Sequence, residues 1–166
     1  MGDFFAAMPP MMALRMLVTL AVTALVHDCE GKMQTNRTRR YLSFVDVKRA
    51  HFYGRATRTV FVELPTEAGH GKSKVGRLLR SMYGCRDAGM NWEIEVARVM
   101  KKLGFEQGVS SPCIYYHPER DMRSLIHGDD LTTLGGPDDL EWLHGSLAHE
   151  WSIVVRAILG PPGSFT

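Results

Sequence analysis

Two adjacent carboxylates, Asp129 and Asp130, lie between two short apolar segments, residues 124–127 and 131–134. Segments of this kind are typical of β-strands joined by a tight turn. Carboxylates that such strands hold side by side repel each other unless a cation lies between them. The pattern therefore indicates a metal site, and an ordinary hydrogen-bonded turn is the alternative interpretation.

A third carboxylate, Asp46, lies in the segment 41–47, which predicts a strand with Leu42, Phe44 and Asp46 on one face. The order of elements is close to the split βαβ arrangement, in which helices back one face of an antiparallel sheet and the other face is free for a ligand. In that arrangement Asp46 is a neighbour of the turn at 129–130. Carboxylates that bridge two divalent ions about 3.5–4 Å apart are suited to phosphoryl transfer, and Mg²⁺ needs few of them. The alternative is that Asp46 is an acid on an edge strand.

Hydrophobic periodicity and turn residues predict the other elements. Three helices are expected, over residues 74–83, over residues 90–103 and from Pro137 onward. Three further strands are expected, over residues 59–64, 111–116 and 151–159. The first of these strands is expected to pair with the strand at 41–47 through a long loop.

The N-terminal segment at 11–26 is apolar but is interrupted by Arg15, so its uninterrupted part is shorter than the roughly 20 residues of a membrane-spanning helix. A signal peptide is the alternative, and Asp3 and the lack of a small-residue cleavage site argue against it. We predict no membrane partner, and a buried helix that follows Pro9 and Pro10. Its apolar face is expected to consist of Leu14, Leu17, Val18, Ala21 and Leu25.

The chain has 166 residues, of which 45% are hydrophobic and 23% charged, and this composition suits one compact domain. We assign that domain to residues 1–160 and treat residues 161–166 as a tail. Residues 32–80 contain twelve Lys or Arg and three Asp or Glu, whereas residues 81–166 contain seven and twelve. The basic part is suited to a polyanion such as nucleic acid, and a solvated basic surface is the alternative.

Two further observations argue against a structural zinc site and against a P-loop. The three cysteines, Cys29, Cys85 and Cys113, lack the spacing of a zinc site, which indicates a reduced intracellular protein without structural zinc. Residues 69–73 resemble half of a phosphate-binding P-loop. Because Thr66 occupies the position of that motif's first glycine, we interpret these residues as a surface loop.

Five segments resemble, in order, motifs of the reverse transcriptase domain of copia-type LTR retrotransposons, over the chain from about residue 9 to residue 160. Residues 44–54 are similar to the family's Asp-Val-Lys-Thr-Ala-Phe-Leu-Asn-Gly, and residues 127–131 correspond to its Tyr-Val-Asp-Asp-Leu. The other three segments are residues 60–65, residues 79–88 with Trp92, and residues 103–105 with 110–115.

The resemblance implies an α+β fold, a palm-like split βαβ with incomplete fingers and no thumb. It implies that Asp46, Asp129 and Asp130 are the catalytic carboxylates and bind two Mg²⁺ ions, with Mn²⁺ as a possible substitute. The residues that it places near the template and the incoming nucleotide are His51, Tyr83, Gly84 and Arg86.

The chain departs from the family motifs at four residues in three places. His51 stands where the family has an aromatic residue that screens out ribonucleotides, Asp87 replaces Gln, and His127-Gly128 replaces Tyr-Val. A glycine at position 128 is expected to loosen the strand end that positions Asp129.

The implied function is that of an RNA-directed DNA polymerase fragment that performs two-metal nucleotidyl transfer. The alternative is a catalytically degenerate, non-enzymatic remnant that binds nucleic acid. The implied partners are an RNA template, a DNA primer, deoxynucleoside triphosphates and the rest of a Pol polyprotein. The implied location is intracellular, in the cytoplasm, a virus-like particle or the nucleus.

Overall fold

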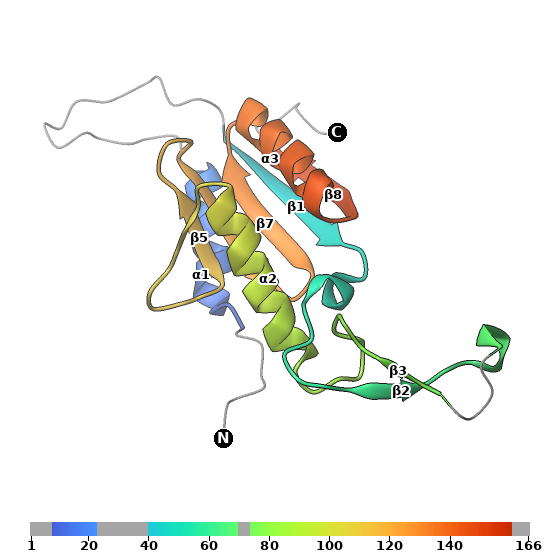
Figure 1. Ribbon diagram of the computed structural model, residues 1–166. Coiled ribbons are helices and arrows are strands. Elements are labelled where there is room, and N and C mark those ends of the chain that lie inside the picture. Colours follow the sequence, from blue (N-terminus) through green and yellow to red (C-terminus); the bar gives the residue numbers. More distant parts are fainter. Residues whose placement is uncertain (1–7, 23–39, 70–73, 161–166) are drawn as a thin grey trace, which may run out of the picture. The chain divides into compact units, whose positions relative to one another are not determined.

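The computed structural model describes residues 8–22, 40–69 and 74–160, which form an α+β fold with antiparallel sheets (Figure 1). The α+β class predicted from the sequence is confirmed. The described residues divide into two compact units. The smaller unit comprises the described part of Arg49–Arg98, and the larger unit contains the remainder.

The larger unit is built on a six-stranded antiparallel sheet in the order β4-β5-β6-β7-β1-β8. Its strands are β1 (Tyr41–Val47), β4 (Glu106–Gln107), β5 (Ile114–His117), β6 (Met122–His127), β7 (Asp130–Gly135) and β8 (Ile153–Leu159). The predicted strands at 41–47, around the acidic turn and at 151–159 are therefore confirmed. The strand expected at 111–116 begins three residues later, at Ile114, because Ser111 and Pro112 belong to the preceding turn.

Helix α3 (Pro137–Glu150) covers one face of this sheet. Pro at its first position favours the start of a helix, and its buried residues are Leu140, Leu143 and Leu147, as the sequence predicted. His144 of α3 also reaches the sheet, where its Nε2 lies 2.7 Å from Oγ of the buried Ser43. The last turn of α2 (Ala88–Lys102) belongs to the same unit and is linked to α3 by the ion pair of Lys102 with Glu150.

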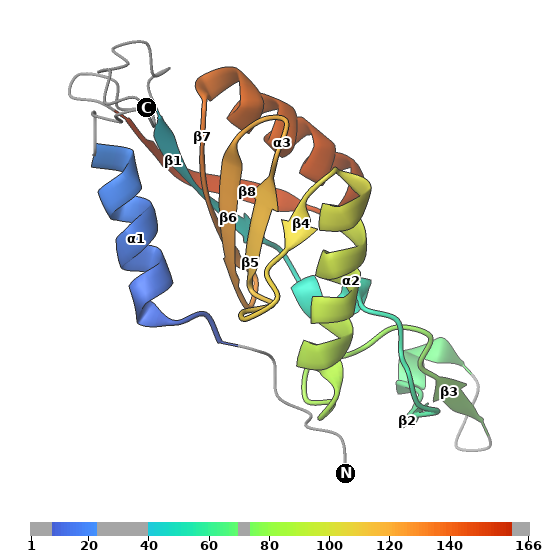
Figure 2. The ribbon, with the colours of Figure 1, turned by 90° about the vertical axis from the view of Figure 1, so that its left-hand side faces the viewer.

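Helix α1 (Met11–Val22) lies on the opposite face of the sheet from α3 (Figure 2). Its one buried residue in the described segment is Leu17, which packs against apolar residues of three strands, Leu42, Leu125 and Leu134. The expected burial of Leu14 and Val18 is wrong, because the residues that meet the sheet are Ala13, Leu17, Leu20 and Ala21. Leu25 lies outside the described residues. The sheet face that the sequence predicted to be free is thus partly covered by α1.

Within the described residues, no helix is both long enough and apolar enough to cross a membrane.

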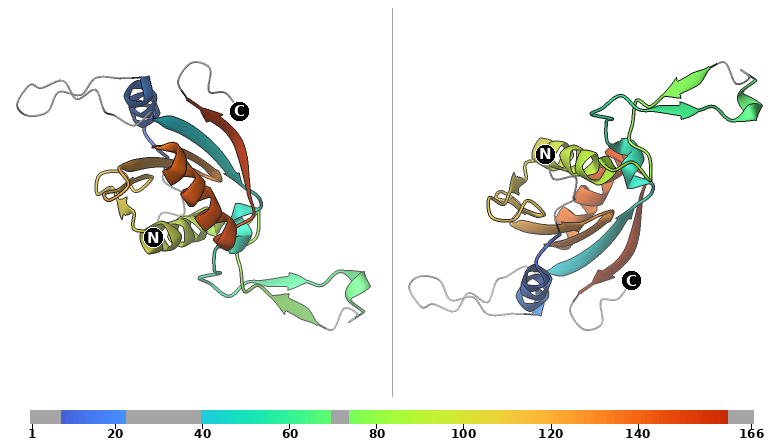
Figure 3. Two further views of the ribbon diagram at one scale, coloured as in Figure 1. Left: turned by 90° about the horizontal axis from the view of Figure 1, so that it is seen from above. Right: turned by 90° about the horizontal axis from the view of Figure 1, so that it is seen from below.

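The smaller unit contains two 3₁₀ turns, η1 (Ala50–Tyr53) and η2 (Thr66–Ala68), and the strands β2 (Phe61–Glu63) and β3 (Val75–Arg77). The two strands pair as an antiparallel ribbon (Figure 3). Val62 is opposite Gly76 in this pairing. The predicted helix at 74–83 is wrong. Val75, which is β-branched, and Gly76 are poor helix formers, and both lie in β3, which pairs with β2. The predicted pairing of 59–64 with 41–47 is also wrong, since β1 pairs with β7 and β8.

The contact between Ser43 and His144 predicts a pH dependence of stability. Burial lowers the pKa of His144, against the negative charge of Glu141, which raises it. The unfolded chain therefore takes up this proton at a higher pH than the folded chain does, and stability falls as the pH drops below the ordinary histidine value of about 6.5.

We expect His144→Gln to reduce the loss of unfolding free energy between pH values of about 7.5 and 5.5. Urea denaturation at the two pH values measures this loss. His149→Gln, at an exposed position of the same helix, is the matched control and should keep the wild-type loss. If His144→Gln shows the same loss of unfolding free energy as the wild type, His144 is not the source of the pH dependence.

Candidate active site

The β6–β7 hairpin carries the two adjacent acids. His127 and Asp130 are paired across the strands, so the loop between them consists of Gly128 and Asp129 alone. Gly128 has φ +62°, a conformation that tight two-residue hairpin loops require and that side-chain-bearing residues rarely adopt. The glycine therefore belongs to the turn rather than to the strand end that it was expected to loosen.

Strand β1 brings Asp46 to this hairpin. Asp46 lies directly opposite Asp130 in the antiparallel register of β1 and β7. The next residue, Val47, donates its backbone N–H to the carbonyl oxygen of Asp129 at 2.9 Å. The structure therefore places the three acids that the sequence singled out at neighbouring backbone positions. Their catalytic and metal-binding roles stay a prediction.

The charges of these acids act on one another. Burial raises the pKa of Asp130 above its ordinary value, and the negative charges of Asp129 and Asp46 raise it further. The nearby charges of His127 and Arg156 act in the opposite direction. Arg156 of β8 also donates from its Nη2 to Oδ2 of Asp46 at 3.2 Å.

The donor set suits a hard divalent cation in its chemistry. Carboxylate oxygens are the ligands that Mg²⁺ prefers, and Mg²⁺ takes only one or two of them, completing its shell with water and substrate phosphate. A cation would also relieve the repulsion that raises the pKa of Asp130. Across the described part of the chain, no three His, Cys, Asp or Glu side chains are already gathered to hold a metal ion.

The other predicted site residues lie in the smaller unit. The rings of His51 and Tyr83 are 4.5 Å apart between centroids, and Phe52, which the sequence had not singled out, lies 5.4 Å from Tyr83. Gly84 follows with φ +91°, and Arg86 is exposed. His51 and Tyr83 thus form one aromatic cluster. Their placement near the template or nucleotide stays a prediction.

Asp87, which departs from the family motif, is buried in a polar network. Its Oδ1 accepts from Nε of Arg58 at 3.0 Å, and its Oδ2 accepts from Nδ2 of Asn91 at 3.1 Å. The same Asn91 nitrogen donates to Oγ of Ser81. Burial raises the pKa of Asp87, but the hydrogen bonds and the charge of Arg58 outweigh it and hold the pKa below its usual value. Asp87 is therefore a charged group, and its hydrogen bonds link two loops to the start of α2.

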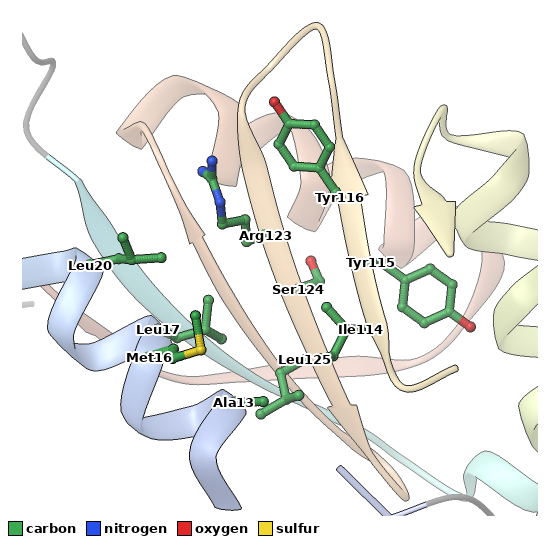
Figure 4. A pocket seen from close by; sticks show the side chains of 10 residues that line it. All are labelled: Ala13, Met16, Leu17, Leu20, Ile114, Tyr115, Tyr116, Arg123, Ser124 and Leu125. Carbon is green, nitrogen blue, oxygen red and sulfur yellow. The ribbon is translucent and has the colours of Figure 1, made fainter. Parts of the chain in front are cut away.

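A pocket of about 350 Å³ lies between α1 and the strands β5 and β6 (Figure 4). Its lining is mainly apolar, with Leu17 and Leu125 on the two sides, and Arg123 and Tyr116 provide its polar edge. Arg123 is opposite Leu134, at the end of the sheet away from Asp130. This pocket is therefore separate from the acids.

Comparisons with known proteins identify the family of this chain. A family model described as reverse transcriptase (RNA-dependent DNA polymerase) matches residues 33–149, more than half of the chain. A retrovirus-related Pol polyprotein from transposon TNT 1-94 of Nicotiana tabacum is 27% identical over 96 residues. That match covers 55% of this chain but only 7% of the polyprotein. No solved structure matches.

An α+β chain with an antiparallel sheet and acids on a central hairpin is consistent with a fragment of a nucleic-acid polymerase. The chain belongs to the reverse transcriptase family of RNA-dependent DNA polymerases. The predicted resemblance to copia-type retrotransposon Pol proteins is confirmed.

The polar network around Asp87 generates a stability prediction. Asp87→Ala should lower the free energy of unfolding by about 1–3 kcal/mol, because Arg58 and Asn91 lose a buried acceptor. Urea denaturation followed by tryptophan fluorescence measures the change. Glu67→Ala, at an exposed position of the same unit, should change stability by less than about 0.5 kcal/mol. Equal effects of the two substitutions would show that the network does not stabilise the unit.

Proposed function

We propose that this chain is the palm region, with part of the fingers, of a copia-type reverse transcriptase that acts within a Pol polyprotein. In this proposal Asp46, Asp129 and Asp130 bind Mg²⁺, for which Mn²⁺ can substitute, during RNA-directed DNA synthesis. The observation that carries the proposal is the register of β1, which sets Asp46 opposite Asp130 while Val47 is hydrogen-bonded to Asp129.

When bound, a pair of Mg²⁺ ions would supply the positive charge that nucleotidyl transfer requires at the reacting phosphate. The chain's own contribution is to hold the carboxylates at fixed positions. Gly128 makes the turn tight, and the pairing of β1 with β7 keeps Asp46 and Asp130 in register. Rigid strands are suited to this task, because misplacement of a reacting group by about 1 Å can reduce a rate 100-fold.

The proposed substrates are an RNA template, a DNA primer and deoxynucleoside triphosphates. Basic side chains that are exposed in the smaller unit would contact the phosphates: Arg49, Arg55, Lys74, Arg77 and Arg80. The aromatic cluster of His51 and Tyr83 would lie near the template or nucleotide, together with Gly84 and Arg86. The proposed location is intracellular, in the cytoplasm, a virus-like particle or the nucleus.

Primer extension on an RNA template with Mg²⁺ tests the proposal, with the chain grafted into the tobacco Pol polyprotein in place of its matching segment. Asp46→Asn or Asp129→Asn should each reduce extension by more than the roughly 10- to 100-fold that loss of an outer-shell metal partner costs. Asp138→Asn, at an exposed position in the first turn of α3, removes the same charge elsewhere and should leave extension unchanged.

Extension that is insensitive to Asp46→Asn would contradict the proposed site. A chimera that extends no primer, together with salt-dependent RNA binding that needs no Mg²⁺ and is unaffected by Asp46→Asn, would instead support the non-enzymatic remnant.

A further inference from the structure

Arg156 is a cation that contacts Asp46, and it lies on a strand, β8, that the family match at residues 33–149 does not include. Its Nη2 donates to Oδ2 of Asp46 at 3.2 Å. Its charge also lowers the pKa of Asp130, although burial and the neighbouring acids have the larger effect and raise it. The positive charge of one guanidinium therefore offsets the negative charges of carboxylates on two different strands, β1 and β7.

Arg156 lies at a β-bulge of β8. β8 pairs with β1 on both sides of a register shift, with Ala157 opposite Phe44 and Val155 opposite Val45. Arg156 is the additional residue of β8 at this shift. Bulges increase the local twist of a strand and re-aim side chains, and they are frequent beside active sites. Here the side chain of the additional residue reaches Asp46, the residue after Val45 on β1.

Arg156 is hydrogen-bonded to the Asp46 carboxylate, which the proposed metal site needs as a ligand. A divalent ion at Asp46 must displace the guanidinium or bind beside a charge of the same sign, and either event weakens the binding of the ion. The side chain of Arg156 is 63% exposed, so it can move into solvent when an ion arrives. The side chain of Asp46 is 20% exposed and is therefore also accessible to an ion.

We propose that Arg156 is the resident counter-ion of the acidic hairpin and competes with the divalent metal for Asp46, so that it sets the metal affinity of the site. This role rests on the proposed function, because it assumes that Asp46 is a metal ligand. Arg156 is a positioning residue, because it acts through Asp46.

A Mn²⁺ titration of the 166-residue chain, followed by the electron paramagnetic resonance signal of free Mn²⁺, tests the proposal without measuring polymerase activity. Arg156→Gln should bind Mn²⁺ about two- to fivefold more tightly than the wild type, the range expected when an exposed ion pair no longer competes. Arg156→Lys keeps the charge and should bind within about twofold of the wild type. Arg156→Met, which keeps the apolar stem, provides a second neutral variant if the Gln variant does not fold.

The matched control is Lys102→Gln. Lys102 pairs with Glu150 in the same unit, and the exposed fractions of the two side chains, 61% and 19%, are close to the 63% and 20% of Arg156 and Asp46. This variant loses the same charge away from the hairpin and should keep the wild-type affinity for Mn²⁺.

Asp46→Asn separates the two proposals. If it weakens Mn²⁺ binding while the neutral Arg156 variants bind like the wild type, the metal site stands and the role of Arg156 is overturned. If Asp46→Asn leaves Mn²⁺ binding unchanged, the proposed metal site fails and the role of Arg156 fails with it. If Arg156→Lys also binds Mn²⁺ more tightly than the wild type, the charge of Arg156 does not compete with the metal and the proposal is overturned.

Discussion

Strand β1 is paired on both edges, with β7 and with β8, and the register of these two pairings determines what surrounds Asp46. The pairing with β7 sets Asp46 opposite Asp130. The pairing with β8 contains the bulge from which Arg156 reaches Asp46. Because side chains alternate between the two faces of a strand, a slip of one residue in either pairing would turn Asp46 away from these neighbours. The chemistry of the site thus depends on the hydrogen-bonded ladder of one strand.

The core of the larger unit holds that ladder in place. Ser43 and Val45, which alternate with Asp46 along β1, are buried, and Ser43 is in contact with His144 of α3. On the other face, Leu17 of α1 covers Leu42 at the end of β1 away from Asp46. Apolar packing therefore covers both faces at one end of the strand, and carboxylates occur at the other. Two of the departures from the family motifs also have local reasons, since Gly128 makes the turn and Asp87 is held by Arg58 and Asn91.

The sequence predicted the strands around the acids well, because alternation and turn residues are local signals that a short segment contains. The hairpin at 128–129 and the strand at 41–47 are examples. Non-local features were missed. The ribbon of β2 and β3 depends on pairing between two separate segments, with Val75 opposite Glu63, whereas the local pattern favoured a helix. Arg156 had no motif to identify it. A bulge depends on the register between two strands, here with Asp46 and Arg156 110 residues apart, and spacing along the chain does not reveal that register.

Paramagnetic broadening of backbone amide signals by Mn²⁺ shows whether Asp46, Asp129 and Asp130 form one divalent-metal site, as we propose. We expect substoichiometric Mn²⁺ to broaden the amide signals of these three residues and of Val47 first. The signal of Leu42, four residues from Asp46 and about 13 Å away along the strand, should broaden later. Broadening that begins at another acidic segment, such as Asp138 and Asp139 at the start of α3, or that appears uniformly over the chain would contradict the proposed metal site.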